Sequence, residues 1–162
     1  MTPAINLAKQ QKLNYKIHEY THDSAAASYG LEAAEKLGVA AERVFKTLVV
    51  KTDNGQLAVT VLPSDHTLNF KKVAKALGAT KNLACKKVQM AEPKEVERSS
   101  GYVLGGVSPL GQKKRLVTLI DNSAKKHPTI YVSAGRRGLE MELAATELAE
   151  TLQAHFADIV DH

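Results

Sequence analysis

Two features of the sequence could do chemistry: a lysine inside an apolar strand and a glycine-rich segment. In VFKTLVV, residues 44–50, the alternation of a strand places Lys46 on one face with three apolar residues, Val44, Leu48 and Val50. A lysine is costly to bury without a partner. Either its stem packs near a sheet edge with the ammonium in water, or the ammonium belongs to a site. Lys46 is therefore the first candidate functional residue.

The segment GYVLGGVSPLG, residues 101–111, holds four of the chain's ten glycines. Such a cluster indicates an unusual turn or the close approach of something to bare backbone. Its backbone N–H groups could hold a carbonyl oxygen or an oxyanion. Without a ligand, the segment would be a bulged strand leading into a Ser-Pro turn. The spacing matches neither a P-loop nor a dinucleotide-binding fingerprint.

No other residue stands out as a nucleophile or a metal ligand. Ser108 could act as a nucleophile only with a base at hand, and no local motif supplies one. The single cysteine, Cys85, has no CxxC or histidine spacing and is interpreted as a small filler side chain. The six histidines also lack metal-ligand spacing. We therefore expect neither a bound metal nor a catalytic triad.

The charge of the chain points to a polyphosphate partner, although charge runs also form ordinary solvated faces. Lysine and arginine exceed aspartate and glutamate by five, and basic clusters of this kind can bind nucleic acid. Aromatic residues are too few for a base-stacking sheet. The clusters comprise Lys71, Lys72, Lys75, Lys81, Lys86 and Lys87, then Lys113, Lys114 and Arg115, then Lys125 and Lys126, then Arg136 and Arg137.

The length of 162 residues suits a single domain over 1–162. The N-terminal MTPAINLAKQQK lacks a signal-peptide core, and no apolar run reaches membrane-spanning length. We therefore expect a cytoplasmic protein without membrane attachment.

The pattern along the chain predicts helices and strands in irregular order. Because they do not form a strict βαβ repeat, we expect an α+β fold with a curved, barrel-like mixed sheet surrounded by helices. The predicted helices cover 3–14, 28–37 closed by Gly38, 69–77 closed by Gly78, 93–98 and 146–155. The predicted strands cover 15–20, 44–52, 56–62, a short run near Leu83, 115–121, 129–134, 138–143 and 156–160, with a hairpin turn at Asp53-Asn54-Gly55.

Four stretches in chain order carry a family resemblance. They are Lys46 within VFKTLVV, KKVAKALG at 71–78, ERSSGYVLGGVSPLG at 97–111 and VSAGRRGLEMEL at 132–143. Together they resemble the YbaK/EbsC family, the free-standing homologues of the editing domain of bacterial-type prolyl-tRNA synthetases. The resemblance covers nearly the whole chain. Its most specific elements are the hairpin lysine and the G-x-x-x-P pattern from Gly105 to Pro109.

The resemblance implies a cleft for the aminoacylated 3′ end of tRNA, no metal, no cofactor, and prolyl-tRNA synthetase as a further partner. Lys46 would be the catalytic residue that contacts the substrate. Tyr20 and Tyr29 would wall the pocket, although either ring could equally belong to the core. The remaining substrate-binding residues that it implies are Gly101, Gly105, Gly106, Ser108, Pro109 and Ser133.

The implied activity is removal of cysteine from mischarged Cys-tRNA(Pro), with Cys-tRNA(Cys) as a second substrate. An aminoacyl ester is already reactive, so orientation and oxyanion stabilisation could suffice. Our hypothesis is that the substrate thiol attacks its own ester carbonyl, so that the aminoacyl group leaves as a thiolactone. The alternative is attack by water held by backbone groups or by the terminal ribose hydroxyl. Two other functions stay open: a non-catalytic tRNA-binding accessory module and a small-molecule hydrolase.

Overall fold

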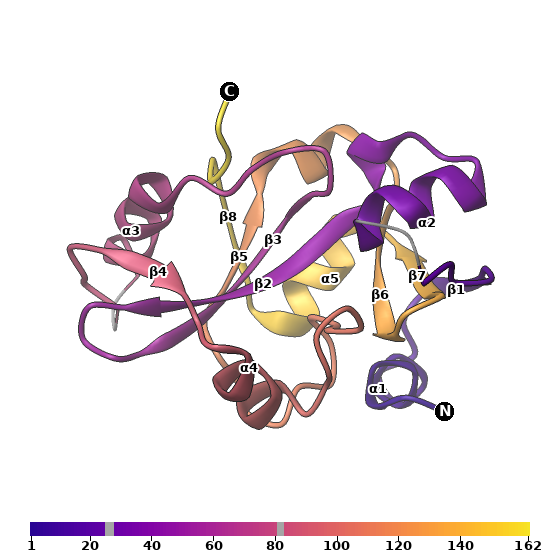
Figure 1. Ribbon diagram of the computed structural model, residues 1–162, viewed down its shortest axis with the longest axis horizontal. Helices are drawn as coiled ribbons and strands as arrows, with labels where there is room; N and C mark the ends of the chain where they lie inside the picture. The colour runs from indigo at the N-terminus through magenta and orange to yellow at the C-terminus, as the bar shows by residue number, and fades with distance from the viewer. Residues whose placement is uncertain (25–27, 81–82) are drawn as a thin grey trace.

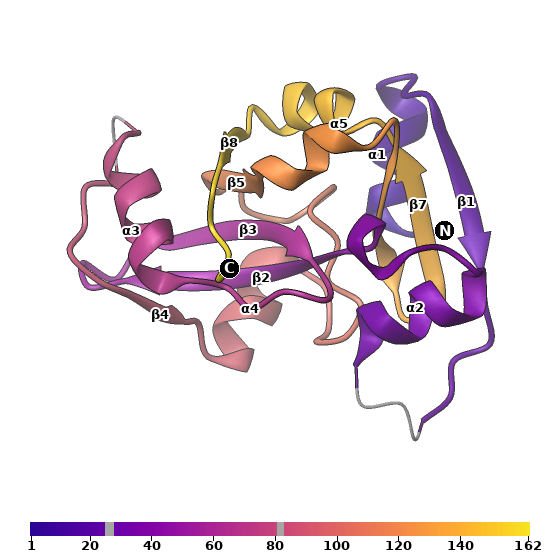
Figure 2. The same cartoon turned by 90° about the horizontal axis from the view of Figure 1, so that it is seen from above.

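The computed structural model describes residues 1–24, 28–80 and 83–162. Two β-sheets lie side by side, with helices packed around them (Figure 1). Helix α3 and strand β4 lie at one end of the molecule, and α1, α2 and the smaller sheet lie at the other, as both views show (Figure 2). Lys81, predicted within a basic cluster, lies outside the described residues.

The larger sheet has five strands in the order β4-β2-β3-β5-β8. The pairs β4-β2 and β2-β3 are antiparallel, whereas β3-β5 and β5-β8 are parallel. The predicted hairpin between β2 and β3 is confirmed, and its turn contains Gly55 with a φ of +82°. The strands are β2 (Phe45–Thr52), β3 (Leu57–Pro63), β4 (Val88–Met90), β5 (Thr118–Asp121) and β8 (His155–Ala157).

The smaller sheet is antiparallel, with the order β1-β7-β6. It consists of β1 (Tyr15–Glu19), β7 (Leu139–Leu143) and β6 (Ile130–Arg136), and β6 carries a bulge between Ser133 and Arg136. Among the described residues, an isolated bridge pairs Tyr131 of β6 with Val44, the residue just before β2 of the larger sheet. The mixed α+β class is confirmed, but the barrel-like description is wrong. A barrel needs a continuous ladder around its circumference, and within the described ranges the two sheets are not closed into one.

The helices α1, α2 and α3 begin where short polar side chains cap their first N–H groups. Thr2 caps α1 (Pro3–Gln10), Ser28 caps α2 (Tyr29–Leu37) and Asn69 caps α3 (Phe70–Gly78). Gly38 ends α2 in the left-handed conformation, as predicted. Two further helices, α4 (Pro93–Ser100) and α5 (Ala145–Leu152), follow, with short 3₁₀ helices at Ala41–Arg43 and Asn122–Lys126.

Several predicted boundaries are wrong. Helix α1 ends at Gln10 rather than near Asn14, and α5 ends before His155, which pairs within β8. Gly78 lies inside α3 and does not cap it. The strand expected near Leu83 forms instead at β4, because residues 88–90 pair with β2 far away in sequence.

Both faces of β2 are buried, against different apolar clusters. Phe45 and Val49 belong to the main core, which also contains residues of β3, β6, β7 and α5. Val50 belongs to a second cluster with residues of β3 and α3, and Leu48 packs against it. The first half of β2 thus runs between two packed regions close to the junction of the sheets, and there it carries Lys46.

Candidate functional site

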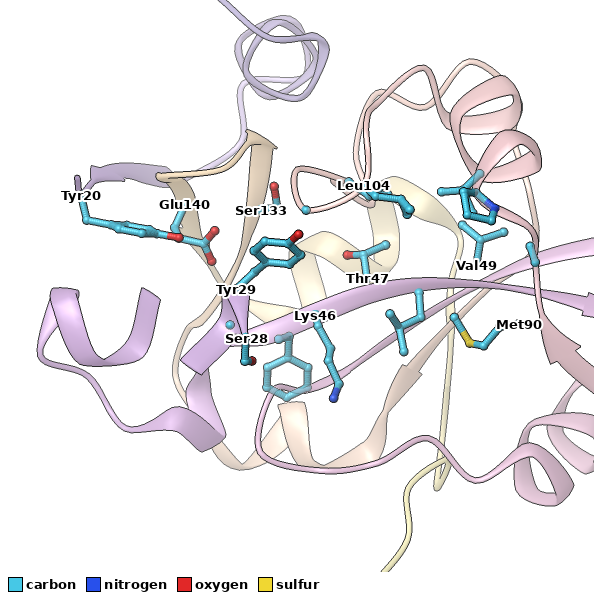
Figure 3. A pocket seen from close by; sticks show the side chains of 18 residues that line it. Tyr20, Ser28, Tyr29, Lys46, Thr47, Val49, Met90, Leu104, Ser133 and Glu140 are labelled. Carbon is cyan, nitrogen blue, oxygen red and sulfur yellow. The ribbon is translucent and has the colours of Figure 1, made fainter. Parts of the chain in front are cut away.

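A cavity of about 500 Å³ opens beside the first half of β2. Its wall is assembled from the end of β1, the start of α2, β2 itself, the approach to α4, the segment after α4, and the β6-β7 hairpin (Figure 3). Its size suits a small molecule or one end of a larger one. Most of its lining is apolar, with a few polar groups that face inward.

Lys46 is half-buried in this wall. Burial lowers the pKa of its ammonium because the charged form is poorly solvated there, and the negative charge of Asp65 offsets part of the effect. Its Nζ has no hydrogen-bond or ion-pair partner in the described part of the chain. Figure 3 shows Lys46 and Thr47 leaving β2 on opposite sides, as strand alternation requires. Lys46 is thus a cation held in the wall without a protein anion bound to it.

Thr47 is a second polar group of the cavity that the sequence did not single out. Its hydroxyl is buried and has no hydrogen-bond partner among the residues described. A buried hydroxyl without a partner is unfavourable. A ligand in the cavity could satisfy it.

Tyr29 forms a wall of the cavity between an arginine and a glycine. The Arg137 guanidinium carbon lies 3.7 Å from the centroid of the Tyr29 ring, and Arg137 Nε lies 3.7 Å from Glu32 Oε1. On the glycine side, a Cβ added to Gly105 would lie 2.9 Å from Tyr29 Cζ. Gly105 also has a φ of +92°, which favours glycine. Gly105 is therefore required both by its backbone conformation and by the tyrosine beside it.

Glu140 is the most unusual group in the wall. It is 7% exposed, and burial raises the pKa of its carboxyl to about 8. Tyr20 lies at the same end of the cavity, and its ring extends toward Glu140 (Figure 3). The pKa of Tyr20 is also raised, first by burial and then by the charge of Glu140. Sequence reasoning missed Glu140 because LEMEL alternates, and alternation alone assigns its glutamates to a solvent face.

The cavity brings together five of the residues that the sequence predicted for the site. These are Tyr20, Tyr29, Lys46, Gly105 and Ser133. They come from β2, the β6-β7 hairpin, the start of α2 and two loops, so residues far apart in the sequence converge. Their roles in binding or catalysis stay predictions.

Four predicted site residues do not line the cavity. Gly101 ends α4 with a φ of +83°, and its N–H donates to the Glu97 carbonyl. A Cβ on Gly106 would lie 2.8 Å from Arg136 Cα. Ser108 is fully buried, and its Oγ accepts a hydrogen bond from the Leu110 N–H at 3.2 Å. Pro109 lines a second cavity of about 440 Å³. Most of this glycine-rich segment therefore serves capping and close packing.

The lysines predicted to contact phosphates differ in whether their side chains are exposed to solvent or bound to other groups of the protein. Lys71 and Lys75 are exposed on α3. Lys72 instead donates to Asp158 at 3.0 Å and to the Val160 carbonyl at 2.7 Å, so it ties α3 to the C-terminal segment. Lys72 is therefore less available to a nucleic acid than its neighbours.

No group of three histidine, cysteine, aspartate or glutamate residues suited to a metal ion is found within 1–24, 28–80 and 83–162. No helix in this part of the chain is both long enough and apolar enough to cross a bilayer.

Residues 23–151 match the family model described as "Aminoacyl-tRNA editing domain". A protein of Enterococcus faecalis named "Putative Cys-tRNA(Pro)/Cys-tRNA(Cys) deacylase EbsC" is 37% identical over 160 residues, which cover 98% of this chain and 92% of that protein. A proline–tRNA ligase of Pelobacter propionicus is 27% identical over 108 residues, which cover 67% of this chain but 18% of the ligase.

Among solved structures, one described as "a putative trans-editing enzyme for prolyl tRNA synthetase" superposes with a TM-score of 0.80. The two chains are 20% identical, and the match covers 100% of this chain and 99% of the other. At that identity the likeness shows a shared fold.

Proposed function

The chain belongs to the aminoacyl-tRNA editing domain family, and we propose that it is a trans-editing deacylase that removes cysteine from Cys-tRNA(Pro). The observation that carries this proposal is Lys46, a half-buried cation in the wall of the cavity that has no hydrogen-bond or ion-pair partner among the described residues. The name of the Enterococcus faecalis relative supports cysteine as the amino acid and Cys-tRNA(Cys) as a second substrate. The match to part of a proline–tRNA ligase supports tRNA(Pro) and a functional link to prolyl-tRNA synthetase.

In this proposal the cavity takes the aminoacyl ester and the terminal adenosine of the tRNA. Lys46 and the Thr47 hydroxyl orient the ester, and one backbone amide assists them. Gly101 and Gly106 donate their N–H groups to the carbonyls of Glu97 and Val103. The Gly105 N–H has no acceptor within the described ranges and lies in the cavity wall. It is therefore the glycine amide suited to stabilise the developing oxyanion.

The chemistry needs no protein nucleophile. The substrate thiol loses its proton, and its sulfur forms a bond to the ester carbonyl carbon. The bond from that carbon to the ribose oxygen breaks, and the ribose oxygen takes up a proton. The product is a thiolactone, which water then hydrolyses to cysteine. In this sequence the protein supplies orientation and charge stabilisation. Direct attack by water held in the cavity is the alternative.

The test is deacylation of Cys-tRNA(Pro), Ala-tRNA(Pro) and Pro-tRNA(Pro), all on the same tRNA body. We expect rapid release of cysteine, slower release of alanine and no release of proline. If the protein bound charged tRNA but cleaved none of the three esters, it would be a non-catalytic accessory module. If it cleaved small esters but not charged tRNA, it would be a small-molecule hydrolase.

A further inference from the structure

Glu140 is a carboxyl group turned to the cavity, and none of the described residues is hydrogen-bonded or ion-paired to it. It is 7% exposed and lines the cavity, and it makes no hydrogen bond or ion pair with the residues described. Buried carboxylates are normally paired or hydrogen-bonded, because an isolated buried charge is very unfavourable. A buried acid left open toward a cavity therefore indicates a ligand with a complementary group.

The polar neighbours of Glu140 are already engaged with other groups. In the smaller sheet, Glu140 is in register with His18 of β1 and Ser133 of β6. His18 Nε2 lies 2.8 Å from Glu142 Oε1, and the Ser133 Oγ accepts a hydrogen bond from the Gly135 N–H. The Arg137 guanidinium stacks on the Tyr29 ring. The cation that would balance Glu140 is thus not supplied by these neighbours.

The two ends of the cavity differ in chemistry (Figure 3). Glu140 lies with Tyr20, Ser133 and Tyr29 at one end, whereas Val49 and Met90 lie toward the other. Lys46 lies between these two ends, so a ligand with a cationic head at the Glu140 end and an ester group next to it, within reach of Lys46, would match this arrangement.

We propose that Glu140 binds the α-ammonium group of the aminoacyl ester and thereby makes the cavity selective for esters with a free amino group. This inference rests on the proposed function. Every aminoacyl-tRNA carries this amino group next to the ester carbonyl, so its capture fixes the reacting carbonyl as well. An N-acylated ester, such as that of a peptidyl-tRNA, would instead place a neutral amide against the carboxyl. The cavity would therefore exclude growing peptides while it admits free aminoacyl groups.

The protonation state of Glu140 fits this role. Burial raises the pKa of its carboxyl to about 8 in the free protein, so at neutral pH the group is mostly uncharged. An ammonium beside it favours the carboxylate. Binding of the substrate would thus create the charge pair inside the cavity, and the free protein would not carry a buried, uncompensated charge.

The experiment pairs a substrate change with a residue change. Cys-tRNA(Pro) is compared with 3-mercaptopropionyl-tRNA(Pro), which keeps the thiol and the ester but lacks the amino group and adds no bulk. Both are given to the wild type, to Glu140→Gln and to Glu142→Gln. Glu142 is the matched control because it lies two residues along β7, outside the cavity lining, and is hydrogen-bonded to His18 and Thr129.

We expect Glu140→Gln to lower kcat/KM for Cys-tRNA(Pro) by about 30-fold or more, the usual scale for truncating one partner of a buried charge pair. The wild type should lose a similar factor on the substrate without the amino group. On that substrate Glu140→Gln should add little further loss, and Glu142→Gln should behave like the wild type on both.

The inference is overturned if Glu140→Gln lowers kcat/KM for both substrates by the same factor, since the carboxyl would then act on the ester or on the fold. It is also overturned if the wild type cleaves both substrates equally well. Failure of the proposed function has a different signature: the wild type would not cleave Cys-tRNA(Pro) at all. Thermal unfolding of Glu140→Gln, in which the amide has nearly the shape of the acid, checks that the variant is folded.

Discussion

The ring of Tyr29 lies directly over Gly105, so close that a Cβ on the glycine would come within 2.9 Å of the ring carbon Cζ. We predict that Gly105→Ala lowers deacylation at least about tenfold. The tyrosine must shift within the cavity wall, and a displacement of about 1 Å near the reacting groups can have a much larger effect. Deacylation of Cys-tRNA(Pro) under single-turnover conditions measures the loss.

The matched control is Gly55→Ala in the β2-β3 turn. Gly55 has a φ of +82°, close to that of Gly105, but an added Cβ there meets no atom of the described residues within 4 Å. Both variants should therefore lose about 1–2 kcal/mol of unfolding free energy through backbone strain. Only Gly105→Ala should lose activity, and equal activity losses in the two variants would show that strain, not the position of Tyr29, is responsible.

We predict that Lys46→Ala abolishes deacylation and leaves the fold intact. Removal of a half-buried ammonium that has no partner within the described residues should not lower the thermal unfolding temperature. The matched control is Lys51→Ala on the same strand, since Lys51 pairs with Glu95 at 2.9 Å and lies outside the cavity. It should keep activity. Wild-type turnover by Lys46→Ala would remove Lys46 from the mechanism.

The local parts of the fold could be predicted from the sequence because neighbouring residues decide them. Ser28 and Gly38 bound α2 through their own side-chain and backbone properties, and Asn54-Gly55 makes the hairpin turn. The parts that failed depend on distant partners. Residues 88–90 form a strand because they pair with the edge of β2, which is distant in the sequence. Whether the two sheets close into a barrel depends on pairing between them, and the residue pattern of neither sheet alone predicts that pairing.

The same division separates the site residues. Lys46 stands out because its own strand is apolar, so the local pattern shows the anomaly. The glycine cluster indicates that some group packs closely against the backbone, but it does not identify that group. In the structure, Gly106 packs against the backbone of Arg136, and Gly105 packs against the ring of Tyr29. Glu140 has an ordinary alternating pattern and becomes unusual only when other elements cover its face.

Glu140 also predicts how stability depends on pH. The pKa of its carboxyl rises from 4.5 to about 8 on folding, so the folded state binds the proton more tightly than the unfolded state. The contribution of Glu140 to the unfolding free energy is therefore fully present below about pH 4.5 and is lost as pH rises toward 8. Over this window we expect Glu140 to lower the unfolding free energy by at most about 5 kcal/mol.

Urea unfolding between pH 4.5 and 8.5 measures this effect in the wild type and in Glu140→Gln. The difference in unfolding free energy between them should shift in favour of the variant as pH rises, because an amide does not ionise. A difference that stays constant with pH would mean that Glu140 titrates near its usual value in the folded protein.

We predict that joint replacement of Lys71 and Lys75 by alanine raises KM for charged tRNA and leaves kcat nearly unchanged. Both side chains are exposed on α3, and loss of a phosphate contact lowers the salt dependence of binding by about 0.7–0.9 in log–log slope per contact. KM measured at several salt concentrations gives this slope. An unchanged slope would place the tRNA on another face.

Lys72→Ala serves as the comparison for this pair. Lys72 is bound to Asp158 and to the Val160 carbonyl, so its loss should loosen the C-terminal segment and lower thermal stability. Its effect on the salt dependence of KM should be smaller than that of either neighbour.

The last prediction concerns the origin of the nucleophile. Cys85 lies outside the cavity lining, packs against the second apolar cluster, and has a thiol pKa raised by burial and by the charge of Asp53. A raised pKa leaves less thiolate, which is the reactive form. Cys85→Ser should therefore deacylate Cys-tRNA(Pro) at nearly the wild-type rate. A large loss in that variant, with the fold intact, would give the protein thiol a role.

Removal of the thiol from the substrate should have the opposite result. Ser-tRNA(Pro) and Ala-tRNA(Pro) should react far more slowly than Cys-tRNA(Pro), because a hydroxyl is a weaker intramolecular nucleophile and a methyl group is none. Mass spectrometry should detect cysteine thiolactone before free cysteine, and oxygen-18 from labelled water should be absent from the thiolactone. Equal rates for alanine and cysteine would exclude attack by the substrate thiol, and the nucleophile would then be water bound in the cavity beside Lys46.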